Sequence, residues 1–232
     1  MGGVGIADTS EAASALRWWI EMGVDIATQE EPRNWFERAA APLAAPTEAV
    51  AEAQPAPATL DAFRLWLASE AAPLASTRSR AVLPSGAQGA EVMLLSDPPS
   101  REEMADGQPI GGEAAVLMER MLAAIGMSGR AYSANLACFH SPGPRLTPKQ
   151  IEECGAAARQ HVLLAEPKRL LLLGDAASRA VLGKLLLQAR GHVHTVEGVR
   201  TVATFHPRQL LRRPSDKALA WKDLLLLTED QS

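Results

Sequence analysis

The sequence predicts an α/β protein of three layers, in which helices cover both faces of a central, mainly parallel sheet of about four strands. Two short runs, 92–95 and 169–173, are almost entirely apolar, which is typical of strands buried on both faces. Segments with helical spacing of apolar residues separate these runs, and such alternation favours parallel pairing. In a sheet of this kind, ligands bind at the carboxyl ends of the strands.

The expected elements begin at residue 90. The clearest helix covers 147–165, because Thr147 is followed by a proline and then by Gln150 at capping-box spacing. The strand 169–173 comes directly after this helix. The other expected elements are a strand at 92–95, a helix at 113–125, a strand at 131–137, a helix at 176–187, a hairpin or two short strands at 193–196 and 201–204, and a helix at 215–227.

Composition divides the chain into three parts. Residues 1–39 have helical spacing and are expected to form an N-terminal helical extension. Residues 40–89 are rich in alanine and proline and are expected to form a linker with one short helix, 59–71. Residues 90–232 form the main domain. In the short helix, Thr59 is the expected N-cap and the inward residues are Leu60, Phe63 and Leu67.

The overall composition excludes several classes of protein. Of 232 residues, 47% are hydrophobic and 22% are charged, so the chain is not globally disordered. A net charge of -4 excludes a generally basic nucleic-acid coat protein but not a local basic patch. The sequence has no apolar run of membrane-spanning length and no signal-peptide pattern. Two cysteines make no disulfide framework, so we expect a cytoplasmic protein without membrane contact.

Four loops follow the expected strands and are therefore the places to look for a site. They cover 96–112, 135–146, 174–175 and 205–209. None holds a GxGxxG motif or a P-loop, so a dinucleotide or nucleoside triphosphate site loses its main support. The sequence also lacks HExxH and GxSxG, the motifs of zinc proteases and of many serine hydrolases.

The loops instead resemble a known set of motifs. The chain reads LSDPPSREEM, GQPIGGEAA, YSANLACFHSPGPR, PKRLLLLGDAA and TFHPRQLLRRPSDK, followed by Trp221. In order and spacing these segments resemble GEAPGxxED, GxPFVGxAG, TN with KCRPPxNR, PxxIxxLG and THPxxLLR of the uracil-DNA glycosylase superfamily. The resemblance covers residues 91–227 and is strongest to its bacterial and archaeal iron–sulfur branch. It implies the α/β/α fold of that superfamily.

The resemblance also implies roles for two residues that end strands. His206 would donate a hydrogen bond to the uracil oxygen that gains charge as the base leaves. Asn135 would recognise the base, since a carboxamide offers a donor and an acceptor together. From the residues alone, His206 is better explained as a buried histidine that caps a loop, and Asn135 could equally be a turn residue.

The first loop departs most from the motif. Asp97 takes the place of its glutamate and would orient water or favour the cationic sugar. Serine and proline replace the small residues around it, and Pro98 removes a backbone donor beside the base. Ile110 replaces the phenylalanine that stacks on the base, and a lost stacking contact is worth about 1–3 kcal/mol. A surface turn and simple core packing are the alternative explanations of Asp97 and Ile110.

The cysteines argue against the cluster of that branch. Cys138 and Cys154 fall on two of its four ligand positions, but the N-terminal helices have Leu16-Arg17-Trp18-Trp19 and no cysteine. We therefore expect no 4Fe–4S cluster and no other cofactor, with Trp18 or Trp19 packing in its place. A zinc site of Cys138, His140 and Cys154 would lack a fourth ligand.

A basic cluster follows His206 and suits contact with DNA phosphates. Its members are Arg208, Arg212, Arg213 and Lys217, with Arg145 on a neighbouring loop. The alternative is a solvated helix face balanced by nearby acids. Leu210 and Leu211 would either fill the gap that a flipped nucleotide leaves or pack as ordinary helix residues.

These observations favour a monomeric DNA repair enzyme that hydrolyses the N-glycosidic bond of uracil in DNA. A second interpretation is a divergent DNA-binding module on the same fold, weak or inactive in catalysis, because the first loop and Ile110 are altered. A third is a structural partner in a repair complex, which the linker and extra helices would serve. Strand breakage at uracil separates the first interpretation from the other two.

Overall fold

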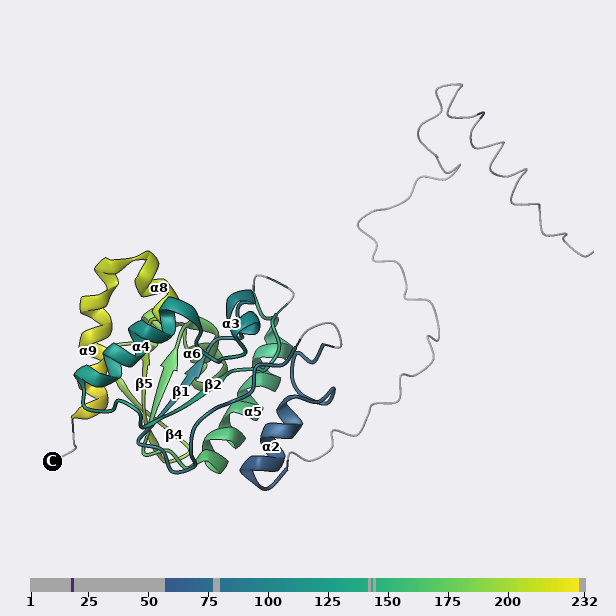
Figure 1. Cartoon of the computed structure of the whole chain (residues 1–232), viewed down its shortest axis with the longest axis horizontal. Helices are drawn as coiled ribbons and strands as arrows, with labels where there is room; N and C mark the ends of the chain where they lie inside the picture. The colour runs from purple at the N-terminus through teal and green to yellow at the C-terminus, as the bar shows by residue number, and fades with distance from the viewer. Residues whose placement is uncertain (1–17, 19–56, 77–79, 142, 144, 230–232) are drawn as a thin grey trace, which may run out of the picture. The chain divides into compact units, whose positions relative to one another are not determined.

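The computed structural model describes residues 18, 57–76, 80–141, 143 and 145–229. Apart from Trp18, these belong to one unit of the chain, Ala51–Ser232. Within the described residues, five strands form one sheet in the order β2-β1-β3-β5-β4, with helices on both faces (Figure 1). The predicted α/β fold is therefore confirmed, with five strands in place of about four.

The sheet is parallel except at one edge. Its strands are β1 (Val92–Ser96), β2 (Ala131–Asn135), β3 (Arg169–Leu173), β4 (Val193–Val196) and β5 (Val199–Thr204). Only β4 runs antiparallel to its neighbour, as the first strand of a hairpin with β5. All five residues of β1 are buried, which explains why this run carries no polar alternation. The carboxyl ends of β1, β2, β3 and β5 meet at one edge of the sheet.

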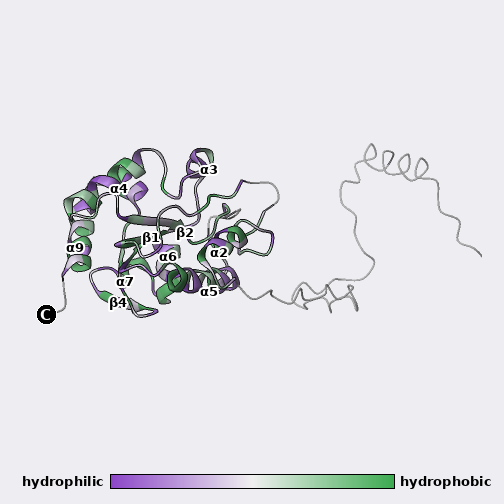
Figure 2. Ribbon diagram, turned by 60° about the horizontal axis from the view of Figure 1, so that its bottom comes forward, coloured by the Kyte–Doolittle hydropathy of each residue, from purple (hydrophilic) through white to green (hydrophobic). Residues whose placement is uncertain are grey.

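The two faces of the sheet are covered by different helices. Alternate residues of β1 and β3 face α4 (Gly112–Ala124) and α9 (Lys217–Thr228) through one apolar cluster. The other residues of these strands face α5 (Pro148–Ala165) and α6 (Asp175–Leu182). Figure 2 shows that α4 and α5 each carry hydrophobic and hydrophilic residues, as helices between a core and water do. Among the described residues, none of the helices has both the length and the apolarity to cross a membrane.

Several helices differ from the expectation. The predicted loops contain two short helices, α3 (Arg101–Asp106) and α8 (Pro207–Arg212). The helix expected at 176–187 ends at Gly183, whose φ of 68° lies in the left-handed region, and α7 (Leu186–Ala189) follows. A 3-10 turn, η1 (Pro214–Asp216), precedes α9.

The described part of the expected linker packs on the sheet domain. The helix α2 (Leu60–Leu67) begins at the Thr59 cap and buries Phe63 and Leu67 against Cys138. The N–H of Val82 donates to the carbonyl oxygen of Cys138 at 2.8 Å. These residues therefore form part of the domain instead of a loose tether. The expected extension at 1–39 lies outside the described residues, except for Trp18, which is helical and 58% exposed.

Candidate active site

Two cavities open at the carboxyl edge of the sheet, on the loop that follows β1. The larger, about 690 Å³, is lined by Asp97, Ser100, His206, Arg208, Gln209, Arg212 and Arg213. The smaller, about 280 Å³, shares Asp97, Ser100 and Arg208 and adds Pro98, His140 and Arg145 among its other lining residues. Asp97 and Arg208 thus stand where the two cavities adjoin. The structure brings together seven of the ten site residues that the sequence predicts.

His206 is buried at the start of α8, where it is the N-cap residue. Its Nδ1 accepts a hydrogen bond from the backbone N–H of Arg208 at 3.1 Å. An accepting Nδ1 places the ring proton of a neutral imidazole on Nε2. Burial, with the nearby Arg208 charge, lowers the pKa of His206 well below its usual value, so the ring is neutral at physiological pH. Nε2–H has no hydrogen-bond partner among the described residues.

Glu103, which the sequence analysis did not single out, faces this imidazole from α3. It is 1% exposed, and its Oε1 lies 3.8 Å from His206 Nε2. Its Oε2 accepts from the Ser100 N–H at 2.8 Å and from Arg208 Nη1 at 2.6 Å. Burial raises the pKa of Glu103, and the Ser100 and Arg208 donors oppose that change. A capping box between Ser100 and Glu103 was the available sequence signal.

Asp97 lies against the beginning of α6. Its Oδ1 accepts from the N–H of Ala177 at 2.9 Å. Burial is the main cause that raises the pKa of Asp97 to about 6. A Cβ at Gly174, whose φ is 108°, would collide with this carboxylate, so the turn after β3 needs glycine.

Asn135 ends β2 beside the last residue of β1, Ser96. Its Nδ2 donates to Ser96 Oγ at 2.7 Å and approaches the carbonyl oxygens of Asp97 and Pro109, both at 3.0 Å. The side chain is 3% exposed, and its Oδ1 has no hydrogen-bond partner among the described residues. Asn135 is therefore held by its nitrogen, next to the loop that carries Asp97.

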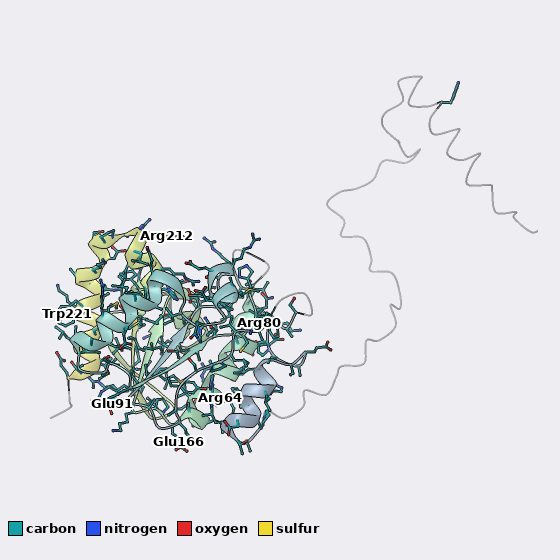
Figure 3. The ribbon with its side chains drawn as sticks, in the orientation of Figure 1. Arg64, Arg80, Glu91, Glu166, Arg212 and Trp221 are labelled. Atoms are coloured by element: carbon teal, nitrogen blue, oxygen red, sulfur yellow. The ribbon has the colours of Figure 1, made fainter. Side chains whose placement is uncertain are left out.

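Three of the predicted residues line neither of these cavities: Asn135, Ile110 and Lys217. Ile110 is buried under α4 with Leu94 and Met118, and lines a third cavity of about 190 Å³. Lys217 lies on α9 and lines an apolar groove with Trp221, apart from the arginines of α8. Figure 3 shows Arg212 and Trp221 in these separate places. The basic cluster expected after His206 is thus divided between two surfaces.

The cysteines do not suit a metal centre of the iron–sulfur type. Cys138 and Cys154 are both buried, and burial raises the pKa of each thiol to about 12. A metal ligand must be a thiolate, which such burial disfavours. The described residues contain no group of three or more histidine, cysteine or acidic side chains that could hold a metal ion.

Comparison with known proteins places this site in a family context. A family model described as the uracil DNA glycosylase superfamily matches residues 83–225, which include every strand of the described sheet. A type-4 uracil-DNA glycosylase of Archaeoglobus fulgidus is 29% identical over 153 residues, 61% of this chain and 77% of the relative. The same type of enzyme from Thermotoga maritima is 28% identical over 153 residues, 63% of this chain and 80% of the relative.

Proposed function

Because the chain belongs to the uracil DNA glycosylase superfamily, we propose that it hydrolyses the N-glycosidic bond of uracil in DNA and leaves an abasic site. One observation carries the proposal. His206 Nε2, Asn135 Oδ1 and Glu103 Oε1 are buried at one edge of the sheet without hydrogen-bond partners among the described residues. Buried polar atoms are nearly always paired, and His206 lines the larger cavity, so its unpaired Nε2–H fits an atom that a ligand completes.

His206 is the group that stabilises the leaving base. The nucleotide first leaves the base stack and enters the pocket, which costs a few kcal/mol. As the bond to the sugar breaks, negative charge collects on the base oxygen next to that bond. The Nε2–H of a neutral His206 donates to this oxygen and needs no proton transfer to act. Glu103 acts through Arg208, whose side chain it anchors and whose N–H holds His206 Nδ1.

Asp97 is the group that stabilises the cationic sugar and positions the attacking water. Its pKa of about 6 leaves it mostly ionised at neutral pH. A carboxylate there favours the positive charge that develops on the sugar and accepts a hydrogen bond from the attacking water. Its position between the two cavities supports this role, since the base and its backbone would occupy different spaces.

The rim of the cavities supports contact with DNA. Arg145, Arg212 and Arg213 are exposed there and can reach phosphates, whereas Arg208 is engaged by Glu103. Leu210 is 1% exposed and Leu211 is 37% exposed. Leu211 is therefore the residue that we assign to fill the stack after the nucleotide leaves it.

An excision assay tests the proposal. Purified protein is incubated with an oligonucleotide that holds one uracil, and alkali then converts abasic sites into strand breaks. We expect breaks with the wild type, and a loss of about 10²–10³-fold in rate for His206→Ala, as for other oxyanion donors. The control is His192→Ala, which removes an exposed imidazole. Unchanged excision by His206→Ala would remove this residue from the mechanism.

The second candidate, a DNA-binding module without catalysis, has support of its own. Ile110 lies in the core instead of beside Asp97 and His206, so no residue at that position stacks on a base. Pro98 also offers no backbone donor. Salt-dependent binding of DNA by the wild type, without strand breaks at uracil, would favour this candidate.

We also propose that the protein acts as a monomer in the cytoplasm and without an iron–sulfur cluster. Such a cluster is normally held by four thiolates, and the chain has two cysteines. Phe63 and Leu67 of α2 surround Cys138 with apolar contacts. The iron content and visible absorbance of the purified protein test the first point, and sedimentation tests the oligomeric state.

A further inference from the structure

A buried ion pair joins α7 and α9 at the carboxyl end of β5. The side chain of Asp223 on α9 is 0% exposed, and its Oδ1 lies 3.1 Å from Nη2 of Arg190, the residue that follows α7. Nε of Arg190 donates to Asp223 Oδ2 at 3.2 Å, and the N–H of Gly191 donates to Oδ1 at 3.0 Å. Burying such a pair costs free energy unless its remaining atoms are also bonded, and these bonds meet that condition.

This ion pair holds both residues that precede His206. Thr204, the last residue of β5, donates its hydroxyl to Asp223 Oδ2 at 2.8 Å. The guanidinium of Arg190 lies over the ring of Phe205, 5.1 Å from the ring centre. Thr204 is fully buried and Phe205 is 3% exposed, so close packing restricts both side chains. The chain therefore enters His206 from two residues that the same pair fixes.

The backbone of Thr204 connects the ion pair to the other side of the site. Its carbonyl oxygen accepts from the N–H of Gly174 at 3.0 Å, and Gly174 lies directly against the carboxylate of Asp97. The N–H of Asp97 donates to the carbonyl oxygen of Leu173 at 3.1 Å. The ends of β1, β3 and β5 are thus tied together where Asp97 and His206 lie.

We propose that Asp223 and Thr204 are positioning residues, which hold the end of β5 so that the imidazole of His206 is in place at the larger cavity before a base arrives. The inference rests on the proposed function. A donor must be held close to its productive position, because a displacement of about 1 Å can cost about 100-fold in rate. Neither positioning residue lines the two cavities of the site, so both act through the backbone.

Thr204→Val tests the inference, with Thr201→Val as its matched control. Both threonines are fully buried on β5, and each change removes one hydroxyl, but that of Thr201 donates to the carbonyl oxygen of Val199 and not to the ion pair. We expect kcat for uracil excision to be at least about tenfold lower in Thr204→Val than in Thr201→Val, with KM within about twofold. Thr204→Ser keeps the hydroxyl and should stay within about threefold of the wild-type kcat. Asp223 is left intact, because its removal would strand the buried charge of Arg190 and endanger the fold.

A second readout does not depend on catalysis. The N–H of Arg208 donates to His206 Nδ1, so its hydrogen exchange reports whether the imidazole keeps its place. We expect this N–H to exchange at least about tenfold faster in Thr204→Val than in Thr201→Val. A simple loss of packing would affect the two valine variants alike.

Equal kcat values or equal exchange rates in the two valine variants would overturn the inference, and so would a Thr204→Ser as slow as Thr204→Val. Uracil excision by the wild type alongside any of these results would leave the proposed function standing. If the wild type does not excise uracil, the proposed function fails, and the exchange of the Arg208 N–H still decides whether the ion pair holds His206.

Discussion

Asp97 is held in a place that disfavours its charge. Burial raises its pKa from 3.8 to about 6, although the N–H of Ala177 donates to it. Between these two values the folded protein keeps a proton that the unfolded chain has released. The contribution of this group to stability is therefore lost as the pH rises through that window. The charged form costs stability, as expected of a group kept for catalysis.

The first prediction concerns the pH dependence of excision. The rate should rise as the pH increases through about 6, because Asp97 must ionise, and this rise is the acidic limb of the pH–rate profile. His206 should add no second limb at higher pH, because its pKa is already low. Asp97→Asn should abolish the limb together with most of the rate. It should also raise the free energy of unfolding at pH 7.5, by up to about 3 kcal/mol. A limb near pH 6 that persists in Asp97→Asn would assign it to another group.

The second prediction concerns Glu103. In Glu103→Gln an amide replaces the carboxylate that holds Arg208 and Ser100, and its NH₂ can face the Nε2–H of His206, donor against donor. We expect kcat to fall by about 10–100-fold with KM nearly unchanged, as for a lost charged hydrogen bond. Glu113→Gln, an exposed change on α4, is the control. Full activity of Glu103→Gln would mean that Arg208 positions His206 without this anchor.

At the scale of elements, long apolar patterns were predictable and short polar helices were not. β1, β3 and α5 follow directly from apolar runs and the Thr147 cap. α3 and α8 have six residues each, too few for a period to appear, although Ser100 and Glu103 carry a capping box. Glu103 was missed for that reason. His206 and Asn135 were found because they lie at or just after strand ends and match residues of the glycosylase motifs. The contacts of the Asn135 amide depend on backbone carbonyls that no sequence pattern reveals.

The third prediction concerns α2, the helix inside the expected linker. Phe63 is fully buried beside Trp66 and Cys138, so Phe63→Ala should lower the free energy of unfolding by about 3–5 kcal/mol. Leu65→Ala, on the exposed side of the same helix, should change it by less than about 0.5 kcal/mol. Chemical denaturation measures both. Equal stability of the two variants would mean that α2 is not part of the folded unit.

At the scale of the whole domain, charge is distributed unevenly. The chain has a net charge of -4, yet exposed arginines gather at the rim of the cavities. Figure 3 places Arg212 at one end of the domain, with Glu91 and Glu166 at the other. In an acidic protein, exposed arginines at the rim of the cavities give that rim a local attraction for DNA phosphates.

The fourth prediction follows from this distribution. Binding of DNA should weaken as salt increases, because arginines that contact phosphates release counterions. The slope of log K against log salt is negative, and each of Arg212→Ala and Arg213→Ala should make it shallower by about 1 if that residue contacts one phosphate. Arg130→Ala removes an exposed arginine just before β2, at the opposite end of the strands, and should leave the slope unchanged. Equal slopes for all three variants would mean that DNA approaches another surface, and the cavities of Asp97 and His206 could not then receive its base.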